Sequence, residues 1–139
     1  DERGYPDTTD PAAHDRLVRR LVAKVESARR AIADYEVTNP DAGTVFVTYG
    51  PPSRTVEQVM RDYPDDAVGH LRLRVVWPFP EFALHEFPNA ETYIVPELNM
   101  GQVVREVERH VDRPVVPLGK IGGELHTPAE LVRALEAHR

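Results

Sequence analysis

The stretch that decides the fold of this chain is Val95-Pro-Glu-Leu-Asn-Met-Gly-Gln-Val-Val-Arg-Glu-Val-Glu108. It continues the apolar run Tyr93-Ile94, which predicts the end of a buried strand. Asn99-Met100-Gly101 predicts a turn, and from Gln102 to Val111 apolar residues recur at the spacing of a helix. Open α/β sheets meet ligands and partners at the carboxyl ends of their strands. We therefore expect Glu97, Asn99 and Gln102 to lie on a working edge.

The composition limits what the chain can do. Its 139 residues, 41% of them hydrophobic, suit one globular domain with a core. A net charge of −6 makes nucleic acid or an anionic membrane an unexpected partner. No apolar run approaches the roughly 18 residues of a membrane span, and no signal-peptide pattern is present, so we expect a cytoplasmic protein. With no cysteine, the chain cannot form disulfides or ligate an iron–sulfur cluster through thiolates.

Residues 1–43 are predicted to form an extended arm over 1–10 and then one long helix that links to a preceding domain. The helix is expected to begin at Asp10-Pro11, with Asp10 as N-cap, and to end at about Glu36. Its apolar residues form a narrow seam, which either packs on the body of the chain or pairs with a partner helix. The seam consists of Leu17, Leu21, Val25, Ala28, Ile32 and Tyr35. A first residue other than Met indicates an excised fragment or a processed chain.

Residues 44–139 are predicted to form an α/β domain. Apolar Leu71 and Leu73 alternate with arginines, which predicts that their strand is half-exposed or at an edge. Thr127-Pro-Ala-Glu130 predicts a capping box at the start of the last helix. Because strands alternate with helices, we expect a small, mostly parallel sheet with helices on both faces. The expected strands are 44–48, 68–76, 91–95 and 114–118, and the expected helices are 53–62 with Ser53 as cap, 81–87, 102–111 and 127 onward.

Four segments resemble, in the right order, the α subunit of 2-oxoacid:ferredoxin oxidoreductases. Phe46-Val-Thr-Tyr-Gly50 is similar to the first strand and glycine turn of that family. His70–Glu81 resembles its strand that enters a Trp-Pro-Phe-Pro corner, and Pro96–Val107 and Gly119–Glu130 resemble segments nearer its C-terminus. The resemblance implies a transketolase C-terminal-like domain, which is a three-layer α/β/α sandwich, here preceded by a helical arm.

The resemblance also implies a function. The parent enzyme would decarboxylate a 2-oxoacid on thiamine diphosphate and Mg²⁺, form an acyl-CoA from coenzyme A, and pass electrons through 4Fe–4S clusters to ferredoxin. The cofactor ligands would lie mostly on the β subunit, and the substrate loop in a preceding domain of the α subunit. This chain would then organise the subunit interface and be inactive alone. The Trp77–Pro80 corner is most similar to the 2-oxoglutarate branch, while pyruvate and branched-chain branches remain open. A stand-alone interaction module of this fold, or the C-terminal domain of another transketolase-group thiamine enzyme, are the alternatives.

Two groups of residues are candidates for binding, and none is predicted to be catalytic, to bind a cofactor or to ligate a metal. Glu97 is expected to accept hydrogen bonds from turn amides. The two aromatic residues of the corner either fill the core or anchor a partner. A weaker anion-site candidate at the start of the 53–62 helix competes with a simple capped helix start; its residues are Gly50, Ser53, Arg54 and Thr55. We define the docking edge as Trp77, Phe79, Glu97, Asn99, Met100, Gly101 and Gln102.

Overall fold

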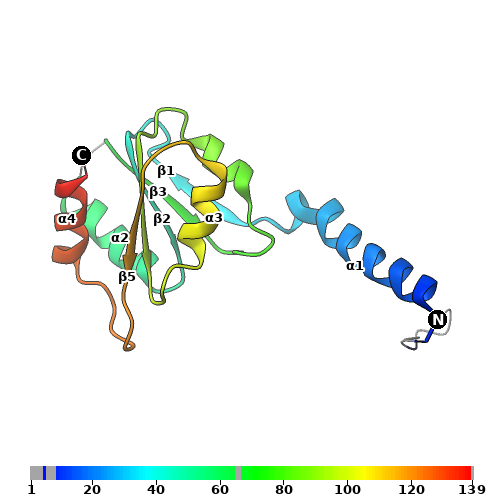
Figure 1. Cartoon of the computed structure of the whole chain (residues 1–139). Helices are drawn as coiled ribbons and strands as arrows, with labels where there is room; N and C mark the ends of the chain where they lie inside the picture. Colours follow the sequence, from blue (N-terminus) through cyan, green and yellow to red (C-terminus); the bar gives the residue numbers. More distant parts are fainter. Residues whose placement is uncertain (1–4, 6–8, 65–66, 139) are drawn as a thin grey trace. The chain divides into compact units, whose positions relative to one another are not determined.

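The computed structural model describes residues 5, 9–64 and 67–138. The chain divides into two compact units, Asp1–Ile32 and Ala33–Arg139. The first unit contains one long helix and the second contains the sheet with the remaining helices (Figure 1).

Helix α1 spans Pro11–Ile32, and none of its residues is buried. The Asp10 carboxylate accepts a hydrogen bond from the Ala12 amide at 2.9 Å, so the predicted N-cap is confirmed. The extended arm predicted for residues 1–10 lies largely outside the described residues. The predicted helix end at Glu36 is wrong, because α1 stops at Ile32.

Strand β1, Tyr35–Thr38, replaces the expected last turn of that helix. It pairs antiparallel with β3, Val68–Leu73, and places Tyr35 opposite Leu73. The Glu36 carboxylate contacts both Arg72 and Arg74 of the neighbouring chain segment. Cross-strand charge pairs of this kind stabilise the pairing of two strands. The helical spacing of the apolar residues up to Tyr35 does not predict this pairing. The α/β unit therefore begins at Ala33, earlier than the predicted division between residues 43 and 44.

Three further strands are β2, Thr44–Tyr49, β4, Thr92–Glu97, and β5, Val115–Gly119. The sheet has five strands in the order β1-β3-β2-β4-β5, and all neighbours except β1 and β3 are parallel. The mostly parallel sheet is thus confirmed. The edge position expected for β3 is wrong, because β1 covers its outer side. Arg72 alternates with apolar residues for another reason: its guanidinium pairs with Glu36 at 3.1 Å and with Glu57 at 2.9 Å.

Helices cover both faces of the sheet, which confirms the three-layer α/β/α architecture (Figure 1). On one face, α2 (Pro52–Asp62) and α4 (Pro128–Ala137) bury an apolar cluster around Phe46 and Ile94. On the other face, α3 (Val103–His110) and the 3₁₀ helix η1 (Glu81–Glu86) bury a larger cluster around Val47 and Val95.

A buried polar chain connects the sheet to the first turn of α2. Thr48 Oγ1 lies 2.6 Å from His70 Nε2 and 2.8 Å from Ser53 Oγ, and all three side chains are buried. The expectation that Ser53 caps α2 is wrong, because the helix starts from Pro51 without a side-chain cap. Desolvation, with a smaller contribution from the Arg72 charge, lowers the pKa of His70 to about 4.

The His70 side chain should make stability depend on pH. In the unfolded chain it takes up a proton near its ordinary pKa of 6.5, whereas in the folded chain it does so only near 4. The free energy of unfolding should therefore fall as pH decreases from 6.5 to 4, by about 3 kcal/mol for a shift of this size. Urea unfolding across this window should give a flatter profile for His70→Gln than for the wild type. His14→Gln, at an exposed helix position, should keep the wild-type slope, and parallel profiles for all three would contradict the prediction.

Candidate functional site

The candidate site lies where β2 and β4 end, next to each other in the sheet. After β2 the chain passes through α2 to β3, and after β4 it passes through α3 to β5 on the opposite side. The strand order therefore reverses between β2 and β4. Such a topological switch point is the usual binding position in open α/β sheets.

Glu97, the last residue of β4, holds the start of α3. Its side chain is 1% exposed. One carboxylate oxygen accepts from the Val104 amide at 2.9 Å, and the other accepts from Val103 at 2.8 Å and from Gln102 at 3.2 Å. A carboxylate is favourable there because the unpaired amides and the helix dipole make a helix N-terminus positive. The expectation that Glu97 bonds turn amides is confirmed.

Asn99 completes the turn and ties it to β2. Its Oδ1 accepts from the amides of Gly101 at 2.7 Å and Gln102 at 3.1 Å. Its Nδ2 donates to the Tyr49 hydroxyl at 2.7 Å and to Glu97 at 3.2 Å. Tyr49 in turn donates to Glu97 Oε2 at 3.4 Å. Burial first, and then the Glu97 charge, raise the pKa of Tyr49, so its hydroxyl stays a donor.

Tyr49 belongs to this site although the sequence alone does not single it out. Its only sequence signal is its position as the last strand residue before the Gly50 turn. The partner, Asn99, lies 50 residues away in the chain, so the contact between them depends on the sheet order.

Gly101 is required by two constraints at once. Its φ is +90°, a conformation that L side chains rarely adopt. A Cβ at this position would also lie 2.8 Å from Val104 Cγ1, inside the first turn of α3. The turn can therefore keep its hydrogen bonds to Glu97 and Asn99 only if residue 101 is a glycine.

The structure divides the docking edge. Glu97, Asn99, Met100, Gly101 and Gln102 share the turn after β4, where Met100 is 83% exposed. Trp77 follows β3 instead and is 71% exposed. Phe79 is only 6% exposed and stacks on His110 with ring centroids 5.8 Å apart. Of the two alternatives for Phe79, filling the core or anchoring a partner, the structure supports the first, because Phe79 packs in the core beside α3.

A hollow of about 280 Å³ lies between the ends of β4 and β5. One side is lined by residues of the docking edge, Glu97 and Asn99 to Gly101. The other side is lined by Pro117 to Gly119 and by Ile121, whose side chain is 69% exposed. The loop from residue 119 to residue 126 is thus part of the same surface.

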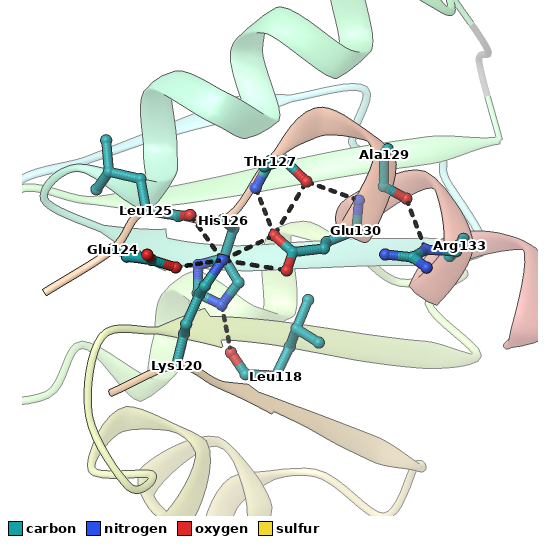
Figure 2. Close-up of polar contacts among 9 residues, drawn as sticks. All are labelled: Leu118, Lys120, Glu124, Leu125, His126, Thr127, Ala129, Glu130 and Arg133. Carbon is teal, nitrogen blue, oxygen red and sulfur yellow. Dashed lines mark hydrogen bonds and ion pairs between the residues drawn. The ribbon is translucent and has the colours of Figure 1, made fainter. Parts of the chain in front are cut away.

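Lys120 links this loop to α4 through hydrogen bonds and an ion pair (Figure 2). Its Nζ donates to the Leu125 carbonyl at 3.0 Å and to both Glu130 oxygens at 3.1 Å. Glu130 also accepts from the Thr127 amide at 2.7 Å, which confirms the predicted capping box. The Thr127 amide, followed by Lys120, lowers the pKa of Glu130 to about 2. Because a carbonyl only accepts, His126 Nε2 donates to Leu118 O at 2.8 Å.

The helix N-termini of the α/β unit leave little for an anion. Pro51 and Pro52 carry no N–H, and the Ser53 and Arg54 amides donate to backbone carbonyls of the preceding turn. Glu97 occupies the start of α3 and the capping box occupies that of α4. The anion-site interpretation of Gly50, Ser53, Arg54 and Thr55 stays a prediction, and Ser53 and Thr55 are buried.

Two kinds of feature are absent from the part of the chain that the structure describes. Within it, no three His, Cys, Asp or Glu side chains are grouped so that they could hold a metal ion. No helix in the same ranges is both long and apolar enough to cross a bilayer.

The model of the pyruvate:ferredoxin oxidoreductase core domain II family matches residues 42–131. This range includes the switch point, the turn after β4 and the loop from residue 119 to residue 126. The chain belongs to this family. It is 47% identical to the 2-oxoglutarate synthase subunit KorA of Methanocaldococcus jannaschii, over 97% of the chain and 37% of that protein. It is 36% identical to the subunit of the same name from Methanothermobacter marburgensis, over 97% of the chain and 38% of that protein. The chain thus spans less than two-fifths of the length of these relatives.

A solved structure shares the fold. The 2-oxoglutarate:ferredoxin oxidoreductase from Magnetococcus marinus, with 2-oxoglutarate, coenzyme A and succinyl-CoA bound, superposes with a TM-score of 0.81. The identity is 23%, and the match covers 97% of this chain and 24% of that one. The resemblance found in the sequence is confirmed at the level of family and fold.

Glu97→Gln should test how much the turn depends on its carboxylate. The amide group would put an N–H where backbone N–H groups now donate, leaving at least one buried donor unpaired. We expect a loss of about 2–3 kcal/mol in the free energy of unfolding. Glu57→Gln is the control, because Glu57 forms a half-exposed ion pair that should contribute less than about 1 kcal/mol. Equal effects in urea titrations of the two variants would show that the Glu97 contacts are dispensable.

Proposed function

We propose that this chain is the core domain II part of a 2-oxoglutarate:ferredoxin oxidoreductase subunit. The observation that carries the proposal is 47% identity to a 2-oxoglutarate synthase subunit over 97% of the chain. The parent enzyme would convert 2-oxoglutarate and coenzyme A to succinyl-CoA and CO₂. The two electrons released would reduce ferredoxin, and one proton would be released.

Within that enzyme, we propose an organising role for this chain. The absence of cysteine means that thiolate ligands for an iron–sulfur cluster must come from elsewhere. The described residues do not fit thiamine diphosphate with Mg²⁺ either, because the starts of α2, α3 and α4 are satisfied internally. We assign these groups to the β subunit and to preceding domains of the same subunit.

The exposed part of the docking edge supports this role. Trp77 and Met100 are large apolar side chains that are 71% and 83% exposed. Aromatic residues and methionine are enriched in protein interfaces. The Met100 turn is also held by Glu97 and Asn99, so it would lose little freedom on binding. We propose that Trp77, Met100 and the polar residues Glu97, Asn99, Gly101 and Gln102 form or support the surface that meets neighbouring domains and the β subunit.

Substrate choice tests the first proposal. The full-length subunit, purified with its partner subunits, should reduce ferredoxin in a coenzyme A-dependent reaction with 2-oxoglutarate. We expect kcat/KM for 2-oxoglutarate to exceed that for pyruvate by on the order of tenfold or more. Polar groups of the site that bind the second carboxylate of 2-oxoglutarate would be left unpaired when pyruvate binds. A preference for pyruvate would assign the chain to another branch of the family.

Trp77→Ala tests the interface. Loss of a central aromatic anchor should weaken association with the partner subunits by about 2 kcal/mol, or about 30-fold in Kd. The melting temperature should stay close to that of the wild type, because the side chain is 71% exposed. Tyr63→Ala, at a 62% exposed tyrosine that directly follows α2, is the matched control. If Trp77→Ala assembles with unchanged affinity, Trp77 is not an interface residue.

A further inference from the structure

Helix α1 has an apolar face that the described part of the chain leaves uncovered. Helices α2, α3 and α4 each bury several of their residues, whereas α1 buries none. Leu21 and Val22, near the middle of α1, are 53% and 57% exposed. A helix in water is stabilised mainly by packing of its apolar face, because its own hydrogen bonds contribute little net free energy. The apolar face of α1 is therefore a candidate contact surface.

The polar side of α1 is strongly basic. The helix contains six Lys or Arg residues and two acidic ones, so its formal net charge is +4, opposite in sign to the −6 of the whole chain. Both acidic residues, Asp15 and Glu26, form ion pairs with arginines of the same helix. Among the described residues, Arg16, Arg20 and Lys24 have no ion-pair partner. Their charges are available to a partner with carboxylates.

The residues of α1 favour a protein partner over a lipid surface. Helices that lie in a membrane interface insert Trp, Phe and Leu into the lipid. Helix α1 has no aromatic residue, and most of its apolar residues are Ala or Val. Five of them follow a seven-residue repeat, which is the spacing of a seam that packs lengthwise against another protein segment. These five, which we call the seam, are Val18, Leu21, Val25, Ala28 and Ile32.

We propose that α1 lies in an apolar groove with an acidic rim on another part of the parent enzyme. The seam contacts the floor of the groove, and Lys24 and Arg20 contact carboxylates on its rim. Lys24 borders the seam because it lies one turn from both Leu21 and Ala28, and Arg20 lies one turn before Lys24. Binding of one helix face in a groove is a common mode of recognition, and complementary charge selects the partner.

This contact is separate from the docking edge, which belongs to the other compact unit. The proposal rests on the proposed place of this chain in a larger enzyme, because the groove belongs to residues outside this chain.

Lys24 gives a direct test, because Lys120 is the other lysine of the chain and is bonded to Glu130. A carbodiimide joins an amine to a carboxylate in contact with it. In the assembled enzyme, Lys24 should be joined to an Asp or Glu outside this chain, as identified by mass spectrometry. A control enzyme with Lys24→Arg and Arg133→Lys moves the amine to an exposed position on α4. Its yield of such links should be on the order of tenfold lower. Equal yields, or no link from Lys24 to a residue outside this chain, would overturn the proposal.

The seam is tested separately by Leu21→Asp in the assembled enzyme. Because no residue of α1 is buried, the α/β unit does not need the Leu21 side chain in order to fold. The substitution should lower the melting temperature of the assembled enzyme by about 3 °C or more, since it places a charge on the floor of the groove. Tyr63→Asp, at a 62% exposed position after α2, is the matched control and should leave the melting temperature unchanged. Equal melting temperatures for the two variants would show that nothing covers the seam.

Two further measurements separate this proposal from its alternatives. In flotation with phosphatidylglycerol vesicles, the assembled enzyme should stay unbound, and binding that Arg20→Glu abolishes would assign α1 to a lipid surface and overturn the groove. Substrate preference reports on the proposed function alone. If the enzyme prefers 2-oxoglutarate while Lys24 stays unlinked, the groove is wrong and the proposed function stands. If it prefers pyruvate while Lys24 is linked, the substrate assignment is wrong and the groove stands.

Discussion

The Glu97 carboxylate joins the end of β4 to the first turn of α3, because its two oxygens accept three consecutive backbone amides. The amides of Val103 and Val104 lie in the first turn of a helix, where no intrahelical acceptor is available to them, and both residues are buried. The positive φ of Gly101, the Asn99 side-chain bonds and the link to Tyr49 all follow from placing the turn within reach of this carboxylate. The Met100 side of the docking edge and the hollow next to β5 are built on that turn.

The same arrangement separates this domain from the nucleotide-binding members of the α/β class. A helix start at a switch point usually offers free amides to a phosphate. Here a side chain of the protein supplies the negative charge, and prolines remove two amides from the start of α2. The switch point is therefore closed by the chain itself, and we propose that its outer surface serves protein contacts. That is consistent with a family whose cofactors we assign to other parts of the enzyme.

Local patterns predict most of the architecture but not the contacts made across it. The spacing of apolar residues in the 103–111 segment predicts one helix, and the capping box at Thr127 predicts another. Sequence reveals both because each signal is local to the helix that it predicts. Tyr35 is misassigned because it continues the spacing of the α1 seam, whereas its true partner, Leu73, is distant in sequence. Ser53 has the chemistry of a cap, yet tertiary packing gives its hydroxyl to Thr48. Trp77 and Phe79 are chemically alike, and only the path of the chain after β3 shows that one is exposed and the other buried.

Strand β1 also covers the outer side of β3. An uncovered parallel sheet would end at β3, whose backbone N–H and C=O groups could then pair with a strand from another molecule. The short antiparallel β1 occupies that position and places Glu36 beside Arg72. A truncated protein that begins at residue 44 would lose this cover while keeping every other strand. The compact unit that contains β1 begins at Ala33, and the more obvious Pro- and Gly-containing segment at 40–43 lies inside it.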